Sequence, residues 1–558
     1  MKKPLSGSSD NGFFEREGIM MKRSDVLIYD TTLRDGTQGE KINFSAEEKL
    51  RIAQRLDDMG FHYIEGGWPG SNPKDARFFE LAKHTRFKHA RLSAFGSTRK
   101  PHIRSENCPN LAAIIQAETP VVTIFGKTWD LHVRDILDIS LTENLAMIRD
   151  SVAYLKLHEK EVIYDAEHFF DGYKNNAAYA RKTIEAALSA GADWVVLCDT
   201  NGGSLPSEVT TIIAEMAALI PLHRMGIHAH NDGDLGVANS IAAVQAGVRM
   251  VQGTINGFGE RCGNADLIPI IANLQLKMKK RCLAEEDLRH LTGLSNYVSE
   301  VANVPPQNSQ PFVGRSAFAH KGGVHVSAVI KNPTAYEHIR PEQVGNKQRV
   351  LVSDLAGKSN IEYKARELGV ELGLDKVTTK KIVKEIKKME DQGYQFDAAE
   401  GSLSLLIKKI TGEFKDPFNL ESYHVMITKR GNEPPLAQAS IKISVGDEQE
   451  VTAAEGNGPI NALDNALRKA LTKFYPQLNE MHLVDFKVRI VEGSEGTAAM
   501  VKVLLDSKDE EEVWSTIGVS DNVIEASWHA LVDSVQYKLS RDKININNRT
   551  ARRRRKDS

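Results

Sequence analysis

Two histidines separated by one residue stand in the stretch GIHAHND, residues 226–232. Because the chain has 17 histidines among 558 residues, this spacing by itself carries little weight, and its position decides its meaning. Alternate side chains of a β-strand point to the same face, so His228 and His230 would share one face and the small Ala229 would take the other. Two imidazoles on one face are a common start of a divalent metal site.

A carboxylate and an amide elsewhere in the chain could complete such a site. Asp35 lies in YDTTLRDGTQ, and Asn264 lies in GFGERCGNA. Together with the two imidazoles they form a mixed nitrogen and oxygen set that suits Mg²⁺, Mn²⁺, Zn²⁺ or Co²⁺ without distinguishing them. The alternative interpretation is that both histidines are hydrogen-bonded core residues.

Arg34 directly precedes Asp35 and could face the same cavity. A permanently charged guanidinium at that place could hold the oxyanion that develops on a carbonyl bound beside the metal. The alternative is a structural arginine that pairs with Glu260 or Glu65.

Eight short apolar runs alternate with segments of helical period between about residues 25 and 280. The runs are VLIYD, YIEGG, ARLSAF, VVTIFG, EVIYDAEHF, WVVLCDT, GIHAHND and MVQGTINGFG. Helical segments such as residues 45–59 begin near Ser, Asn or Asp, and several end at glycine, as capped helices do. Strands this apolar are buried on both faces, which predicts an α/β fold with a closed (β/α)₈ TIM barrel. An open doubly wound sheet is the alternative, but no GxGxxG motif follows the first run.

A barrel would bring the candidate groups together, because catalytic side chains lie at the C-terminal ends of its strands. Asp35, the histidine pair and Asn264 follow strands one, seven and eight, which are neighbours in a closed barrel. Glu167 follows strand five, where it could act as a base or orient another group. Thr200 follows strand six and could donate a hydrogen bond to a carboxylate.

Composition excludes several classes of protein. Lys plus Arg (72) nearly balance Asp plus Glu (74), and the net charge of −2 argues against a nucleic-acid or membrane-surface binder. The sequence contains neither a run of 18 apolar residues nor a signal-peptide pattern, so we expect no membrane span and a cytoplasmic location. The scattered cysteines, without a CxxC motif, fit a reducing compartment.

Outside a barrel at residues 25–284, the chain is predicted to contain four further parts. Residues 1–24 are predicted to be a disordered extension, 285–404 helical hinge subdomains, and 541–558 a basic disordered tail. Between 405 and 540, IKISVGDEQEVTAAEG parallels VKVLLDSKDEEEVWSTIG, and an amphipathic helix follows each. This predicts an α+β regulatory or dimerisation domain with an internal repeat. The loops EGNGP and GVSDN could offer backbone N–H groups to an amino-acid carboxylate.

Three motifs in this order, LRDGTQ, HAHND and GERCGNA, resemble those of the acyl-CoA-condensing barrel enzymes, the 2-isopropylmalate, homocitrate and citramalate synthases. The segment AFAHKGGVHVSAVIKNPTAYEHIRPEQVG, residues 317–345, is similar to their hinge subdomain. The C-terminal repeat is similar to their effector-binding dimer domain. The likeness therefore covers about residues 25–540.

This resemblance implies a role for each candidate residue. Asp35, the two histidines and Asn264 would lie on or near the metal, and Arg34 would polarise the carbonyl of a 2-keto acid. Thr200 would hold the keto acid's carboxylate. His325 and Tyr336 would reach in from the hinge subdomain to assist proton transfer and hydrolysis.

Glu167 fits the strand-five glutamate of the family, although its surroundings, DAEHFFDG, depart from those of other branches. The stretches FGKTWDLHV and DAEHFFDGYK look most like the long-chain citramalate branch. Val122 stands where the isopropylmalate branch carries a histidine, and a small apolar lining there favours a pocket closed around a methyl group. The resemblance therefore implies pyruvate and acetyl-CoA as substrates, with either Glu167 or His325 as the base.

Regulation and rival functions follow from the same resemblance. It implies a homodimer inhibited by isoleucine through the C-terminal domain. The alternatives within enzymes are a 2-isopropylmalate or homocitrate synthase, a hydroxymethylglutaryl-CoA lyase and a biotin-dependent carboxyltransferase. From another class, the chain could be a metabolite-sensing barrel that has lost the chemistry.

Overall fold

The computed structural model describes residues 13–16, 19–22, 25–351, 360, 363, 376–491, 499–510 and 512–554. The chain divides into two compact units. One unit contains Met1–Phe318 with Ile339–Gln348, and the other contains Ala319–His338 with Arg349–Ser558. Within the described residues, no helix is both long and apolar enough to cross a lipid bilayer.

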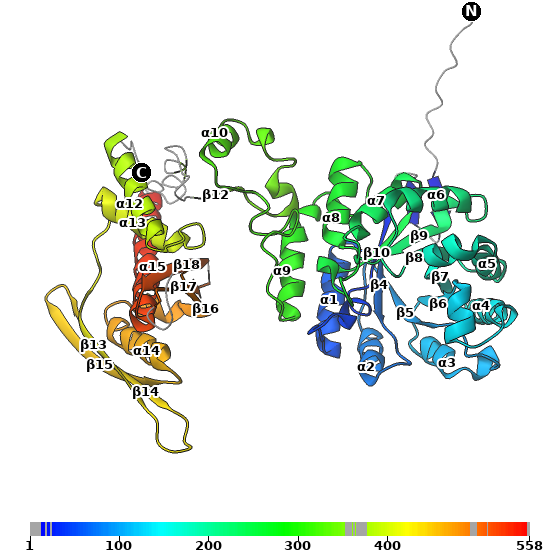
Figure 1. The fold of residues 1–558 in the computed structure, drawn as a ribbon, viewed down its shortest axis with the longest axis horizontal. Coiled ribbons are helices and arrows are strands. Elements are labelled where there is room, and N and C mark those ends of the chain that lie inside the picture. Colours follow the sequence, from blue (N-terminus) through cyan, green and yellow to red (C-terminus); the bar gives the residue numbers. More distant parts are fainter. Residues whose placement is uncertain are drawn as a thin grey trace, which may run out of the picture. The chain divides into compact units, whose positions relative to one another are not determined.

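The first unit is a closed barrel of parallel strands (Figure 1). Around the barrel the strands follow one another in chain order, and the last pairs with the first. In the described part of the unit they are β3 (Leu27–Asp30), β4 (Tyr63–Gly67), β5 (Arg91–Ser97), β6 (Val121–Lys127), β7 (Glu161–Glu167), β8 (Trp194–Asp199), β9 (Met225–Ala229) and β10 (Met250–Gly253). These strands coincide with the eight apolar runs, and the predicted TIM barrel is confirmed.

Helices follow the strands and cover the outside of the barrel (Figure 1). They are α1 (Ala46–Asp58), α2 (Pro73–Ala82), α3 (Pro109–Gln116), α4 (Leu141–Leu157), α5 (Phe169–Ser189), α6 (Pro206–Met216), α7 (Gly236–Gln245) and α8 (Leu267–Ala272). The first begins with a reciprocal cap, in which Ser45 Oγ accepts from the Glu48 N–H and the Glu48 carboxylate accepts from the Ser45 N–H. Such caps stabilise a helix by about 1 kcal/mol.

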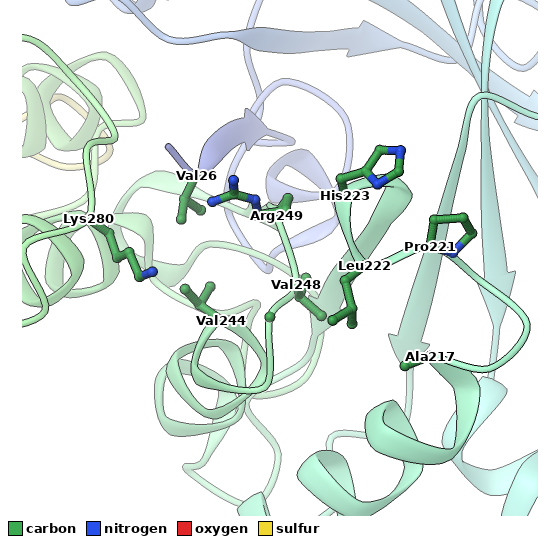
Figure 2. A pocket seen from close by; sticks show the side chains of 10 residues that line it. Val26, Ala217, Pro221, Leu222, His223, Val244, Val248, Arg249 and Lys280 are labelled. Carbon is green, nitrogen blue, oxygen red and sulfur yellow. The ribbon is translucent and has the colours of Figure 1, made fainter. Parts of the chain in front are cut away.

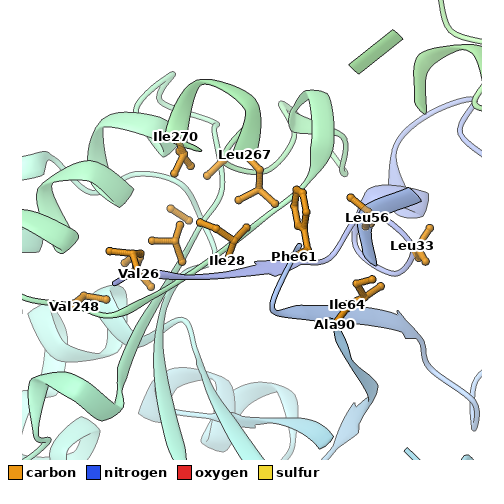
Figure 3. Close-up of a cluster of buried hydrophobic side chains, with 14 of the residues drawn as sticks. Val26, Ile28, Leu33, Leu56, Phe61, Ile64, Ala90, Val248, Leu267 and Ile270 are labelled. Atoms are coloured by element: carbon orange, nitrogen blue, oxygen red, sulfur yellow. The ribbon is translucent and has the colours of Figure 1, made fainter. Parts of the chain in front are cut away.

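Side chains along each strand alternate between two buried layers. One layer, which includes Ile28 and Ile64, packs against the helices (Figure 3). The other fills the barrel interior and consists of Leu27, Tyr29, Tyr63, Val121, Ile163, Trp194, Val196, Cys198 and Met250. This alternation decides which residues face the mouth of the barrel, because inward positions recur every second residue toward the strand ends.

The first unit extends beyond the predicted barrel boundary at residue 284. Helix α9 (Leu291–Val301) buries Leu291, Leu294 and Val298 in the same core as the barrel helices. This helix therefore belongs to the barrel unit, because its apolar face completes the outer layer.

The second unit begins with short elements. Strands β11 (Ala319–His320) and β12 (Arg349–Val350) pair in parallel, and α10 (Gly323–Lys331) follows β11. Helix α12 (Lys376–Asp391) packs on α13 (Glu400–Thr411) through a small core of Ile382, Ile386, Phe396, Leu403 and Ile407.

Helix α13 crosses the predicted domain boundary at residue 404. Ser402 Oγ donates a hydrogen bond of 2.6 Å to Asp533, and Lys408 Nζ donates one of 2.8 Å to Ser540 Oγ. The helix therefore belongs with the C-terminal domain, because its polar side chains are satisfied there.

The C-terminal domain contains one structural unit twice (Figure 1). In the first copy, an antiparallel sheet of β13 (Asn419–Thr428), β14 (Leu436–Val445) and β15 (Glu448–Gly456) precedes α14 (Pro459–Leu471). In the second, an antiparallel sheet of β16 (His482–Ile490), β17 (Val501–Lys508) and β18 (Val513–Ser520) precedes α15 (Val523–Arg554). This topology agrees with the predicted repeat.

Both sheets carry large apolar side chains that are exposed in the single chain. On β13, β15 and β16 these are Leu420, Met426, Ile427, Val451, Leu483, Val484, Val488 and Ile490. Val451 and Ile490 are 67% and 64% exposed. Exposed apolar side chains gathered on neighbouring strands are typical of an interaction site.

The loops before α14 and α15 satisfy much of their own backbone. Asn522 Oδ1 accepts hydrogen bonds from the N–H groups of Ile524 and Glu525, at 2.8 and 3.4 Å. Asn461 Oδ1 accepts one of 3.2 Å from the Asn457 N–H. These three N–H groups are therefore already bound by neighbouring asparagine side chains, and ligand binding by the other N–H groups of the two loops stays a prediction.

Both ends of the chain contain more secondary structure than predicted. Within the predicted disordered extension, β1 (Phe13–Arg16) and β2 (Ile19–Lys22) pair antiparallel, which suits their apolar residues. The rest of residues 1–24 lies outside the described residues. At the other end, α15 continues to Arg554 in place of a disordered tail from residue 541. Arginine is a good helix former and is favoured near a helix C-terminus; residues 555–558 lie outside the described residues.

Candidate metal centre and active site

A carboxylate and two imidazoles converge at the mouth of the barrel. His228 Nε2 lies 3.3 Å from Asp35 Oδ2, and His230 Nε2 lies 3.9 Å from the same oxygen. The two Nε2 atoms are 3.3 Å apart, and all three residues are buried. Ligands about 2.1 Å from a tetrahedral ion lie roughly 3.4 Å from one another, so this spacing suits a divalent metal.

The strands account for this convergence. Ala229 packs in the outer layer against the helices, so His228 and His230 on either side of it point into the barrel. Asp35 lies on the turn after β3, immediately before the short 3₁₀ helix η1 (Gly36–Gln38). Because β10 pairs with both β3 and β9, groups that follow β3 and β9 meet over β10.

Asn264 is placed to add an oxygen ligand. It forms an isolated bridge with His230, and its Nδ2 donates a hydrogen bond of 3.0 Å to the Phe258 carbonyl. Its Oδ1 is buried and has no hydrogen-bond partner among the described residues. A buried carbonyl oxygen without a donor is costly unless a ligand satisfies it, so the residues present fit a bound cation.

The ionisation states of Asp35 and His230 suit a metal site, whereas the Asp35 carboxylate outweighs burial and raises the pKa of His228, which must give up a proton to bind a cation. Burial raises the pKa of the Asp35 carboxyl, but the Arg34 guanidinium and the two imidazoles outweigh this and hold it well below its usual range. Burial and the neighbouring His228 lower the pKa of His230 to about 3. The carboxylate is therefore charged and the His230 imidazole neutral, which are the forms that bind metals.

Arg34 stands between two carboxylates and an aromatic ring. Its Nη1 lies 3.2 Å from Asp35 Oδ2, its Nε donates to Glu65 Oε1 at 2.6 Å, and its Cζ lies 3.8 Å from the centre of the Phe95 ring. The structural pairing with Glu65 is thus present, yet the guanidinium also contacts the metal set. The structural pairing with Glu65 is therefore confirmed, and the role of Arg34 in holding an oxyanion stays a prediction.

A polar layer lies beneath the metal set inside the barrel. His228 Nδ1 lies 2.9 Å from Gln252 Oε1, and Gln252 Nε2 donates a hydrogen bond of 3.1 Å to Asp165 Oδ1. Beside it, the Tyr29 hydroxyl donates to Glu65 Oε2 at 2.7 Å. Burial and the neighbouring Glu65 raise the pKa of Asp165 to about 7.

Thr200 and Glu167 lie on neighbouring strand ends and each has a partner. Thr200 Oγ1 accepts a hydrogen bond of 2.9 Å from the backbone N–H of His168, whose φ of 55° is left-handed. Glu167 Oε2 lies 2.5 Å from Lys127 Nζ. Because Thr200 Oγ1 already accepts one bond, its own proton is available for a substrate oxygen.

Val122 does not line the pocket that the sequence predicts for it. It belongs to the outer layer with Ile124 and Tyr164, whereas Thr123 faces the interior and bonds the Tyr29 hydroxyl at 2.7 Å. The prediction is wrong by one residue, since Thr123 rather than Val122 points inward. Apolar residues stand at both inward and outward positions of β6, so the sequence pattern did not distinguish the two faces.

Aromatic side chains occupy the corresponding inward positions at the mouth. Phe95 and Phe125 stack with ring centres 5.5 Å apart, and Trp68 meets both edge-on at 5.8 and 5.7 Å. With Arg34 stacked on Phe95, these three rings, the aromatic wall, bound one side of the site.

His325 and Tyr336 belong to the second unit. Their rings stack with centres 4.3 Å apart, and both side chains are exposed. Their contact with each other suits a joint role, and their predicted assistance at the metal stays a prediction.

A cavity of 520 Å³ lies at the opposite end of the barrel (Figure 2). Its lining residues, such as Leu222, Val248 and Arg249, precede β9 and β10, and Val26 precedes β3. Catalytic groups in such barrels follow the strands, so this cavity is not the active site.

Sequence reasoning missed the inward polar residues Asp165 and Gln252 and considered Glu65 only as an alternative partner of Arg34. The signal that could have found them is the alternation of inward and outward side chains along each strand. Each stands in an apolar run, at even spacing from a residue of the interior layer, Tyr63, Ile163 or Met250. A charged or amide residue at an inward position must have a polar partner.

Comparisons with known proteins agree with this architecture. The profile of the HMGL-like family matches residues 25–298, that of the homocitrate synthase post-HMGL domain-like family matches residues 312–394, and that of the LeuA allosteric (dimerisation) domain matches residues 397–539.

Full-length relatives extend the match. The (R)-citramalate synthase of Aquifex aeolicus is 56% identical over 93% of this chain and 98% of its own, and that of Geobacter sulfurreducens is 55% identical over 92% and 97%. A probable 2-isopropylmalate synthase of Methanopyrus kandleri is 31% identical over 95% and 99%. The chain therefore belongs to the (R)-citramalate synthase family, with an HMGL-like barrel and a LeuA-type C-terminal domain.

Proposed function

We propose that this chain condenses acetyl-CoA with pyruvate and hydrolyses the thioester, giving (R)-citramalate and CoA. One observation carries the proposal: Asp35, His228 and His230 meet beside Arg34 in a chain whose full-length relatives are named (R)-citramalate synthase. The buried, unpartnered Asn264 Oδ1 among the described residues supports a fourth ligand.

The site residues suit a Claisen-type condensation. A divalent ion held by the three converging residues and Asn264 would supply Lewis-acid activation of the keto carbonyl. Arg34, 3.2 Å from Asp35, would hold the alkoxide charge that develops when the carbonyl carbon is attacked. Thr200 would donate its free hydroxyl proton to the pyruvate carboxylate.

Two residues are candidates for the base that takes a proton from the acetyl methyl group, Glu167 and His325. The resulting carbanion forms the new carbon–carbon bond, and the alkoxide takes up a proton. Water then adds to the thioester carbonyl, and CoA leaves as the thiol. Glu167 is the candidate within the barrel unit, where Lys127 holds its carboxylate.

Pyruvate is favoured over larger keto acids by the aromatic wall rather than by Val122. Phe95, Phe125 and Trp68 pack together beside Arg34, where they would limit the room for a branched substituent. Phe125→Ala should widen the pocket without removing the ring under Arg34. We expect the kcat/KM ratio of 2-oxobutanoate to pyruvate to rise about tenfold, since one methylene is worth about 1–3 kcal/mol. An unchanged ratio would remove the wall from the selectivity argument.

A thiol-release assay tests the activity directly. Metal-stripped protein is mixed with acetyl-CoA and each of several 2-keto acids, before and after a divalent ion is restored. We expect CoA release with pyruvate only after restoration. Preference for 2-oxoisovalerate would indicate a 2-isopropylmalate synthase, and no release with any keto acid would indicate a metabolite-sensing barrel.

The C-terminal repeat is proposed to bind isoleucine as an inhibitor and to dimerise. The match to a LeuA allosteric (dimerisation) domain supports both roles. A second copy of this chain would cover the exposed apolar side chains of β13, β15 and β16.

Two measurements separate these roles. Isoleucine and leucine are added to the full chain and to a chain ending before Lys376, which removes α12 and α13 together with the domain they pack on. Inhibition of the full chain alone supports regulation, and loss of activity on truncation indicates a structural role. Sedimentation of Val451→Asp should show a shift toward monomer; an unchanged dimer would place the interface elsewhere.

A further inference from the structure

Three buried side chains from different strands form one hydrogen-bonded row. His228 on β9 meets Gln252 on β10, and Gln252 meets Asp165 on β7, at 2.9 and 3.1 Å. Their exposed fractions are 5%, 0% and 4%. The row begins at His228, one of the three converging residues, and ends at Asp165 in the barrel interior.

The chemistry of the row defines the orientation of each group. Gln252 Nε2 can only donate, and it faces the Asp165 carboxylate. Gln252 Oε1 can only accept, and it faces His228 Nδ1. The hydrogen-bond network therefore assigns a proton to His228 Nδ1, so Nε2, the atom 3.3 Å from Asp35 Oδ2, is the ring nitrogen left to bind a cation.

We propose that Gln252 is a positioning residue for the metal centre. It fixes the tautomer and the ring orientation of His228, and Asp165 fixes the amide orientation of Gln252. Partners of this kind behind a ligating histidine are typically worth about 10–100-fold in metal affinity. The inference rests on the proposed function, because it needs His228 to be a metal ligand.

A metal titration of the full chain tests this role. Co²⁺ is added to metal-stripped protein and binding is followed by visible absorption and calorimetry. Gln252→Met keeps the approximate shape of the side chain and removes its acceptor and donors. We expect Co²⁺ to bind this variant about 10–100-fold more weakly than the parent.

Two further variants separate positioning from packing. The double variant Asp165→Asn with Gln252→Glu exchanges amide and carboxylate between the two positions. The introduced amide then donates to the introduced carboxylate, which still accepts from His228, so affinity should return close to the parent value. Gln310→Met is the matched control. Gln310 is also buried and donates to an aspartate, Asp266, at 2.9 Å, but it does not contact the converging ligands. The Co²⁺ affinity of this control should equal that of the parent.

The outcomes are distinct. Parent-like Co²⁺ affinity in Gln252→Met, or a folded exchange variant as weak as Gln252→Met, would overturn the proposal. If Gln252→Met does not fold, ¹⁵N spectra of labelled histidine in the parent decide: an Nδ1–H signal for His228 is expected, and a ring that carries Nε2–H without Nδ1–H overturns the proposal. A parent chain that binds no Co²⁺ would overturn the metal site itself and this inference with it.

Discussion

The buried Glu65 carboxylate holds Arg34 at the mouth of the barrel, beside Asp35. Its Oε1 accepts from Arg34 Nε at 2.6 Å, its Oε2 accepts from the Tyr29 hydroxyl at 2.7 Å, and its exposed fraction is 0%. Glu65→Gln keeps the shape but removes the charge. The introduced amide NH₂ can donate to the Tyr29 hydroxyl, which then donates to Thr123 Oγ1 at 2.7 Å, so the hydrogen bonds are kept and the charge opposite Arg34 is lost.

The expected cost follows from this geometry. Removing one partner of a buried ion pair costs about 3–5 kcal/mol, and the retained amide oxygen recovers part of this, so we expect the free energy of unfolding to fall by about 2–4 kcal/mol. Arg34 would also lose its orientation beside the keto carbonyl. Loss of one donor to an oxyanion lowers kcat about 10²–10³-fold, and partial misplacement should approach the lower figure.

A matched control lies at the other end of the same barrel. Glu161 Oε1 accepts from the Tyr63 hydroxyl and from Trp194 Nε1, both at 3.1 Å, and Glu161 pairs with Arg91. These residues begin β7, β4, β8 and β5, far from the mouth. Glu161→Gln should therefore lose similar stability while kcat is retained.

Urea unfolding and thiol release measure the two effects on the same preparations. The reasoning predicts that both glutamine variants lose stability and that only Glu65→Gln loses turnover. It is refuted if Glu65→Gln turns over like the parent, or if Glu161→Gln loses as much activity as Glu65→Gln.

Three other predictions concern separate parts of the chain. The backbone of His168 is left-handed, with φ 55°, and this conformation directs its N–H to Thr200. His168→Val disfavours the conformation, so KM for pyruvate should rise about tenfold with a smaller change in kcat. His168→Asn should resemble the parent, and equal KM values in the two variants would contradict this prediction. Asp35→Asn should abolish turnover and weaken metal binding in a titration, whereas activity in metal-stripped protein would refute the ligand assignment. Burial raises the pKa of Asp533 from 3.8 to about 6, so its stabilising contribution is complete below pH 3.8 and is lost as the pH rises through 6. Asp533→Asn should therefore match the parent near pH 4 and exceed it by up to about 3 kcal/mol at pH 7 in urea unfolding; parallel pH profiles would exclude this effect.

The barrel and the converging ligands were accessible from the sequence because strand order determines which strand ends meet. Asp35 and the histidine pair lie at the ends of strands that a closed barrel makes neighbours, whatever the details of packing. Ala229 between the histidines also fixed their direction, since only one of the two faces can hold polar groups.

The sequence could not predict which residues of β6 point inward, nor which inward polar residues contact one another. Val122 and Thr123 differ by one position in a run that is apolar on both faces, so alternation alone could not assign the inward residue. Gln252 and Asp165 meet across the barrel interior, and their contact depends on strand stagger rather than on sequence spacing.

The exposed apolar side chains of β13, β15 and β16 affect the folding stability of this chain. If a second copy of the chain covers these side chains, part of the folding free energy comes from the contact between the two copies. Dilution alone would then lower the melting temperature. The stability of the C-terminal domain then depends on the concentration of the chain. The protein would therefore be less stable in a cell that makes little of it than in a cell that makes much.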